Sequence, residues 1–302
     1  MAYVTGSANS YADLQAALFS AVTANGYSVN GNVVSKGTMF CEVNVSASNP
    51  VGLTVHGGTG QSGGALTGRS NATLCYMGIA INTLSPTVTW NFTFPVTYSI
   101  HIGTAPDEVY MFVNYQTNCY QYIAFGQSDM PGLGGTGNWF AATARSTDLA
   151  AQSSWGYQTT GFGYANFWCA SLFDGSATYG NQAGAVHHGM DGATNSWLIN
   201  MSFPDRWQAQ WNSPNAWNAE SVLSPIVVYT TRPSGFVSPV LQMGHARWVM
   251  LDNLVDQQII TMGSERWKCY PVWRRGNART QTPTPPNGGT GFLGHAIRYD
   301  GP

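Results

Sequence analysis

The chain has very few charged residues. Asp, Glu, Lys and Arg make up 9% of its 302 residues, whereas a soluble globular protein usually has about a quarter. Lysine occurs only at Lys36 and Lys268. The polar positions of the surface must therefore be filled by Ser, Thr, Asn, Gln, Gly and Tyr, which suit strands and ordered loops better than helices.

The scarcity of charge also excludes some partners. A formal net charge of -2 supplies no positive field for phosphates, so we expect no nucleic-acid partner and interpret Arg274-Arg275 as local salt bridges. No stretch approaches the ~18 apolar residues of a membrane span, and residues 1–10 lack the features of a secretory signal. We expect a protein that is made and folded in a cytoplasm.

The cysteines do not form the pattern of a disulfide scaffold or a zinc site. Their number is odd, they are widely spaced, and apolar residues surround them. We expect most of them to be buried thiols. They are Cys41, Cys75, Cys119, Cys169 and Cys269.

One short segment contains residue types that bind metals. His187, His188 and Asp191 could together hold a divalent cation. Adjacent residues of an extended chain point to opposite faces, however, and no further ligand motif accompanies them. We therefore expect a hydrogen-bonded polar loop there, with no metal and no cofactor.

No pattern of catalytic residues stands out. Asp107 and Glu108 follow Pro106 and are typical of a turn that leads into a strand, whereas a glycosidase needs two carboxylates that face each other across a cleft. The glycine-rich residues 132–137 are not followed by the Lys-Ser or Lys-Thr of a phosphate-binding loop. We expect no enzyme, and a depolymerase is the weakest of the functions considered.

The fold class expected is mainly β, a sandwich-like body with one amphipathic helix near the N-terminus. Apolar residues between Leu14 and Val22 have helical spacing, Ser10 can cap the helix, and Asn25-Gly26 can end it. Asn30-Gly31 then indicates a type I′ hairpin turn.

Strands with alternating apolar residues follow the hairpin. We expect Met39, Cys41, Val43 and Val45 to point inward, residues 57–68 to form a loop, and a bend at Pro95. Residues 109–115 and 120–125 should form a hairpin in the centre of the core.

One structural unit in three parts is expected. Residues 1–129 form the helix and sheet core, residues 130–220 a loop-rich aromatic insertion, and residues 221–302 the strands that complete the body. The last part should contain strands at 221–230, 236–243, 246–251, 258–262, 266–273 and 292–299.

The insertion holds many large aromatic side chains. Exposed rings could stack on sugars, or they could pack against one another or against another subunit. The candidates for binding or subunit contact are Trp197, Trp207, Trp211, Trp217, Tyr157 and Tyr164.

Several motifs, in order, resemble a family of structural proteins of tailed-phage virions, encoded among tail and baseplate components. They lie at residues 13–18, 25–27, 98–102, 105–110, 122–126, 263–271 and 296–302. The resemblance covers about half of the chain, but not residues 130–220. It implies a virion component with no cofactor and no catalytic residues.

The sequence therefore predicts a structural subunit of a bacteriophage virion, in the tail or baseplate. Its partners would be other phage structural proteins and copies of itself in a trimer or ring, because a neutral, aromatic-rich surface has little charge repulsion to keep copies apart. The alternative is a module that binds a host surface polysaccharide.

Overall fold

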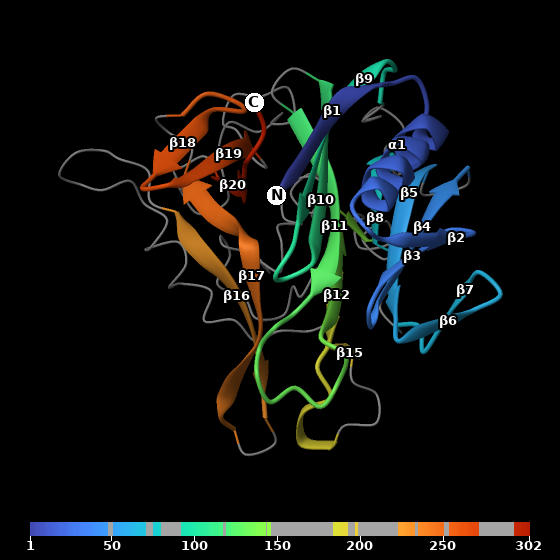
Figure 1. Cartoon of the computed structure of the whole chain (residues 1–302), viewed down its shortest axis with the longest axis vertical. Coiled ribbons are helices and arrows are strands. Elements are labelled where there is room, and N and C mark those ends of the chain that lie inside the picture. Colours follow the sequence, from blue (N-terminus) through green and yellow to red (C-terminus); the bar gives the residue numbers. More distant parts are fainter. Residues whose placement is uncertain are drawn as a thin grey trace, which may run out of the picture.

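Three sheet layers make up the protein in a computed structural model (Figure 1). The structure describes residues 1–47, 51–70, 75–79, 92–116, 119–142, 144–145, 184–192, 197–198, 223–232, 235–250, 254–271 and 293–302. A central sheet stands between an N-terminal sheet with a helix on one side and a C-terminal sheet on the other. The predicted mainly-β, sandwich-like class with one N-terminal α-helix is confirmed in this part of the chain.

The central sheet has seven antiparallel strands. In spatial order they are β1 (Ala2–Ala8), β9 (Val96–Gly103), β10 (Glu108–Gln116), β11 (Cys119–Gln127), β12 (Asn138–Ala142), β14 (Gly184–His187) and β15 (Trp197–Leu198). The hairpin of β10 and β11 is confirmed, and its aromatic residues are buried on both faces, as the sequence predicts. Proline at position 95 precedes β9, which starts at Val96.

The N-terminal sheet has six strands. In order they are β13 (Ala144–Arg145), β8 (Cys75–Ile79), β5 (Val51–Gly58), β4 (Met39–Ser46), β3 (Val33–Lys36) and β2 (Ser28–Asn30). Residues 57–68 are not simply a loop, because β6 (Gly60–Ser62) and β7 (Ala65–Thr67) form a small hairpin there. The inward positions of β4 are predicted correctly except for Val45, which is 40% exposed.

Helix α1 (Tyr11–Ala24) packs beside β1 and the N-terminal sheet, and its two ends are built as predicted. Ser10 Oγ accepts a hydrogen bond from Asp13 N, and the Asp13 carboxylate accepts one from Asn9 N. Such reciprocal bonds satisfy amides that the first turn leaves free. Asn25 caps the other end, and Gly26 has a φ of +82°.

The first hairpin forms, but its turn differs from the prediction. Asn30 pairs with Val33, so the two turn residues are Gly31 and Asn32. Gly31 has a positive φ of 58°, whereas Asn32 does not. A type I′ turn needs positive φ at both positions, so the predicted turn type is wrong although the hairpin is correct.

The C-terminal sheet has five strands. In order they are β16 (Ser224–Thr231), β17 (Val237–Met250), β20 (Leu293–Arg298), β19 (Glu265–Pro271) and β18 (Ile259–Met262). Residues 236–243 and 246–251 were expected to form two strands, but the chain continues through Gly244 as the single strand β17.

Residues 130–220 are partly built into the sheets. Strands β12, β14 and β15 extend the central sheet beyond β11, and β13 lies at an edge of the N-terminal sheet. Segments of two to five residues are too short to show a period in the sequence. Residues 130–137 and 188–192 are described outside these strands, and residues 143, 146–183, 193–196 and 199–220 lie outside the described residues.

Large apolar side chains fill the spaces between the three layers. Phe112 of β10 stacks on Tyr270 of β19, with ring centroids 4.2 Å apart, and so joins the central and C-terminal sheets. Cys41, Cys75 and Cys269 are buried thiols, as predicted. None of the helices among the described residues has the length and apolar character that crossing a bilayer requires.

The Ser10 cap provides a first test of the fold. Replacing Ser10 with Ala removes the acceptor for Asp13 N, so we expect the free energy of unfolding to fall by about 1 kcal/mol. Urea denaturation followed by circular dichroism measures it. Ser20 is exposed in the same helix, and Ser20→Ala should not destabilise the protein. Equal losses in both variants would contradict the capping role.

Candidate functional site

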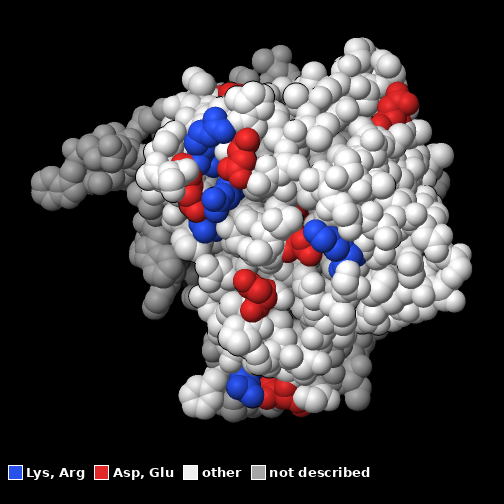
Figure 2. Space-filling model, in the orientation of Figure 1, with Lys and Arg blue, Asp and Glu red and all other residues white. Residues whose placement is uncertain are grey.

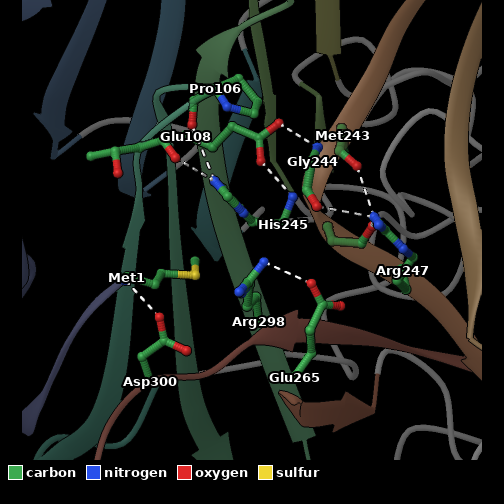
Figure 3. Close-up of polar contacts among 12 residues, drawn as sticks. Met1, Pro106, Glu108, Met243, Gly244, His245, Arg247, Glu265, Arg298 and Asp300 are labelled. Atoms are coloured by element: carbon green, nitrogen blue, oxygen red, sulfur yellow. Dashed lines mark hydrogen bonds and ion pairs between the residues drawn. The ribbon is translucent and has the colours of Figure 1, made fainter. Parts of the chain in front are cut away.

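The most unusual polar residue is Glu108, a fully buried carboxylate at the start of β10. Its Oε1 accepts a hydrogen bond from Gly244 N at 2.9 Å, and its Oε2 accepts one from His245 N at 2.8 Å. Oε2 also accepts a bond of 2.7 Å from the Tyr110 hydroxyl. Figure 3 shows the carboxylate pointing at the backbone of β17. Glu108 therefore ties the central sheet to the C-terminal sheet.

Two glycines allow the sheets to approach closely enough for these bonds. A Cβ atom on Gly244 would lie 2.6 Å from Pro106 Cδ, and one on Gly103 would lie 2.0 Å from the His245 ring. The His245 ring fits into this space and places Nε2 3.2 Å from Pro106 O. Carbonyl oxygens only accept, so Nε2 carries the proton and donates.

Burial dominates the electrostatics of Glu108. It raises the pKa of the carboxyl to about 7, against the opposite effect of the three hydrogen bonds, and nearby Asp129 raises it further. The neutral acid is therefore populated near neutral pH. Because the side chain is 0% exposed and its bonds go to its own chain, it holds two sheets together rather than lining a cleft.

Arg247 is the cation nearest this junction along β17. Its Nη1 donates to the carbonyl oxygens of Met243, Gly244 and Ala246 at 2.8–3.2 Å (Figure 3). Its guanidinium carbon lies 4.7 Å from the centroid of the Trp267 ring. Burial lowers the pKa of this group. Arg247 therefore stabilises the segment of β17 that Glu108 binds.

A second polar contact joins the same two sheets at His101. Burial lowers its pKa to about 3, so the ring is neutral. Nδ1 lies 3.2 Å from Arg298 O and must donate to that carbonyl, so Nε2 accepts from the Tyr270 hydroxyl at 2.7 Å. Nearby, Lys268 Nζ donates to the Tyr3 hydroxyl of β1 at 2.7 Å. These contacts attach the C-terminal sheet to β1 and β9.

The structure does not bring the three candidate metal ligands together. His187 Nδ1 accepts from Thr136 N, and His188 Nδ1 accepts from Met190 N. The Asp191 carboxylate pairs with the Arg232 guanidinium, which lowers the pKa of Asp191. The described residues contain no group of three metal-ligand side chains. His187, His188 and Asp191 therefore lie in a hydrogen-bonded loop.

The glycine-rich residues 132–137 pack against this loop. Gly135 N donates to His188 O and Gly137 N to His187 O, both at 2.9 Å. Because these amides already have acceptors within the chain, they do not point into a phosphate cradle.

One of the six candidate aromatic residues is described, and its ring is buried. Trp197 packs against Phe140 and His187, with ring centroids 5.8 and 5.1 Å away, and its Nε1 donates to Gly68 O. It is 9% exposed and so presents no open face to a sugar. The other five, Trp207, Trp211, Trp217, Tyr157 and Tyr164, lie outside the described residues.

Sequence reasoning missed the role of Glu108. The pair Asp107-Glu108 was interpreted as a turn, which describes Asp107 but not its neighbour. Asp107 pairs with Lys36 of the N-terminal sheet at 2.7 Å, whereas Glu108 binds the C-terminal sheet. The sequence did contain a signal. A strand that is apolar on both faces is covered on both sides, so a carboxylate at its first residue is expected to be buried as well.

The raised pKa of Glu108 predicts a pH effect on stability. The folded value of about 7 exceeds the ordinary value of 4.5, so the native state binds more protons, and this contribution is lost as pH rises through 7. The difference in unfolding free energy between wild type and Glu108→Gln should therefore be larger at pH 5 than at pH 8, by up to about 3 kcal/mol.

Urea denaturation at the two pH values measures this difference. Ser20→Ala, at an exposed position and with no ionisable group removed, is the matched control and should keep the wild-type pH dependence. If Glu108→Gln kept it as well, burial would not govern the ionisation of Glu108.

Comparisons with known proteins do not assign the chain to a family. No protein-family model matches it, and no curated protein is significantly similar to it. Its function must therefore be argued from its residues and their arrangement.

Proposed function

We propose that the protein is a structural subunit of a bacteriophage virion, in the tail or baseplate, that acts by assembling with copies of itself and with neighbouring virion proteins. The observation that carries the proposal is electrostatic. Each Lys and Arg side chain that the structure describes has a partner within its own chain. Four of these cations, Lys36, Arg69, Arg232 and Arg298, pair with carboxylates, so their charge is neutralised at short range in the part of the chain that the structure describes.

The pairs are spread over the molecule. Lys36 pairs with Asp107, Arg69 with Glu42, Arg232 with Asp191 and Arg298 with Glu265. In Figure 2 most of this face is uncharged, and the blue atoms lie next to red ones, although some red patches stand alone. Copies with such a surface meet without strong repulsion, and long-range attraction contributes little, so contact depends on shape, backbone groups and apolar side chains.

The sheet edges supply backbone groups for such contacts. Strands β1 and β18, at edges of the central and C-terminal sheets, expose apolar side chains: Val4, Ile259 and Met262 are 36%, 40% and 49% exposed. An edge strand offers unpaired N–H and C=O groups to another chain. This supports a role in assembly and does not depend on a catalytic residue.

The proposal predicts that the chain is a constituent of phage particles. Mass spectrometry of purified particles from bacteria that carry the coding sequence should detect its peptides at a fixed copy number per particle. Sedimentation of the purified protein should show self-association that increases with concentration. A protein that stays monomeric and is absent from particles would rule the proposal out.

Binding of a host surface polysaccharide is the second candidate, and one described residue favours it. Phe236 is 73% exposed beside the turn between β16 and β17, where its carbonyl accepts a hydrogen bond from Arg232 N. Arg232, which donates that backbone bond, also forms an ion pair with Asp191. An open aromatic ring is suited to stacking on a sugar.

Glycan binding predicts an effect of Phe236→Ala. Loss of the ring should weaken binding of the purified protein to host polysaccharide by up to about tenfold, as measured by surface plasmon resonance. Val255 is an exposed apolar residue elsewhere, 68% exposed, and Val255→Ala should not change binding. Trp207→Ala and Trp211→Ala test the two tryptophans in the same assay. No binding by the wild type would eliminate this candidate.

A further inference from the structure

Strand β1 forms a long, uncharged edge of the central sheet. Its seven residues pair with β9 in an unbroken register from Ala2–Ile102 to Ala8–Val96. It contains no charged residue and no proline, and Val4, Thr5 and Ser7 are exposed. Figure 1 shows β1 at the front of the central sheet, and Figure 2, in the same orientation, shows no charged side chain over its middle.

The other described edge strands are shorter or carry features that hinder pairing. Proteins protect sheet edges with prolines, charges and short strands. Strand β16 contains Pro225, β13 contains Arg145, and β2, β15 and β18 have three, two and four residues. Among the described edges, β1 therefore combines length, regular register and lack of charge.

We propose that β1 pairs with β1 of a second copy of the chain, antiparallel about a two-fold axis, so that two central sheets become one. This inference rests on the proposed assembly function and names the surface through which it acts. Half of the N–H and C=O groups of an edge strand point away from its one neighbour. In the pair, each copy supplies the acceptors and donors that the other needs.

The sequence of β1 is complementary to itself in this arrangement. With the axis at Thr5, that residue faces its own copy, Val4 faces Gly6, and Tyr3 faces Ser7. Larger side chains thus oppose smaller ones, and a Thr–Thr pair, which is favourable across antiparallel strands, lies at the centre. A charged partner strand would find no opposite charge on β1 to bind. A second copy of β1 is also uncharged, so the two strands do not repel each other.

The size of the contact sets its expected strength. Seven residues in one strand pair bury less surface than the about 1,200 Å² of a stable standard interface. The free protein should therefore dimerise weakly and reversibly. Further contacts within a particle would stabilise the pair, because a second contact between tethered chains acts at a high effective concentration.

Charge substitution at Thr5 tests the proposal. Thr5→Lys and Thr5→Glu each place like charges directly opposite one another across the axis, so each should weaken self-association by at least about tenfold. An equimolar mixture of the two variants should restore association, because opposite charges then face each other. Sedimentation velocity over a concentration series measures all three samples, and circular dichroism confirms that the variants are folded.

Strand β18 provides the matched control. Thr261 is exposed on this second uncharged edge, and Thr261→Lys should leave association unchanged. The proposal is overturned if the wild type is monomeric at every concentration, if Thr5→Lys associates like the wild type, or if Thr261→Lys alone dissociates it. If particles contain the chain but the Thr5 variants still associate, the β1 contact is wrong while the structural function stands. Absence from particles would instead refute that function.

Discussion

The constraint on which the structure depends is that the central sheet is covered on both faces. A polar side chain that enters such an interior must find its partners inside the protein, because an unsatisfied buried group costs several kcal/mol. Here the partners are backbone groups of neighbouring sheets. Glu108 binds Gly244 N on one side, while Gln121 bonds both N and O of Gly78 on the other. In both cases one backbone partner is a glycine, whose missing Cβ lets two sheets approach within reach of a side chain.

The same constraint determines which charges exist inside the molecule. At Glu108 the cost of burial exceeds the gain from three hydrogen bonds, as its pKa of about 7 shows. At His101 burial lowers the pKa to about 3 and leaves a neutral ring that both donates and accepts. The interior thus uses ionisable residues largely in neutral forms. At the described surface, Lys36, Arg69, Arg232 and Arg298 pair with carboxylates, so this part of the surface also carries little net charge.

The sequence predicted features that depend on neighbouring residues and missed those that depend on layering. The Ser10 cap and the helix after it follow from local patterns, as does the hairpin of β10 and β11. The different roles of Asp107 and Glu108 could not be predicted, because they arise from the two sheets that cover opposite sides of β10. The sequence likewise predicted two strands at 236–243 and 246–251, whereas β17 runs on through Gly244, whose close approach to Pro106 the sequence does not show.

With its described cations bonded within the chain and a formal net charge of -2, the protein has little electrostatic means of selecting partners. Its specificity must then come from interactions of short range, namely shape and backbone hydrogen bonds, which are strongest where a strand lacks a neighbour. Such edges are hazardous when they are long and uncharged, and Pro225 and Arg145 lie on two of the described ones. The edge at β1 carries neither feature, although Thr or Ser could have been replaced there by Lys with little effect on an exposed position. A lone molecule gains nothing from an unprotected edge, so the lack of protection at β1 is best explained by a partner strand that covers it.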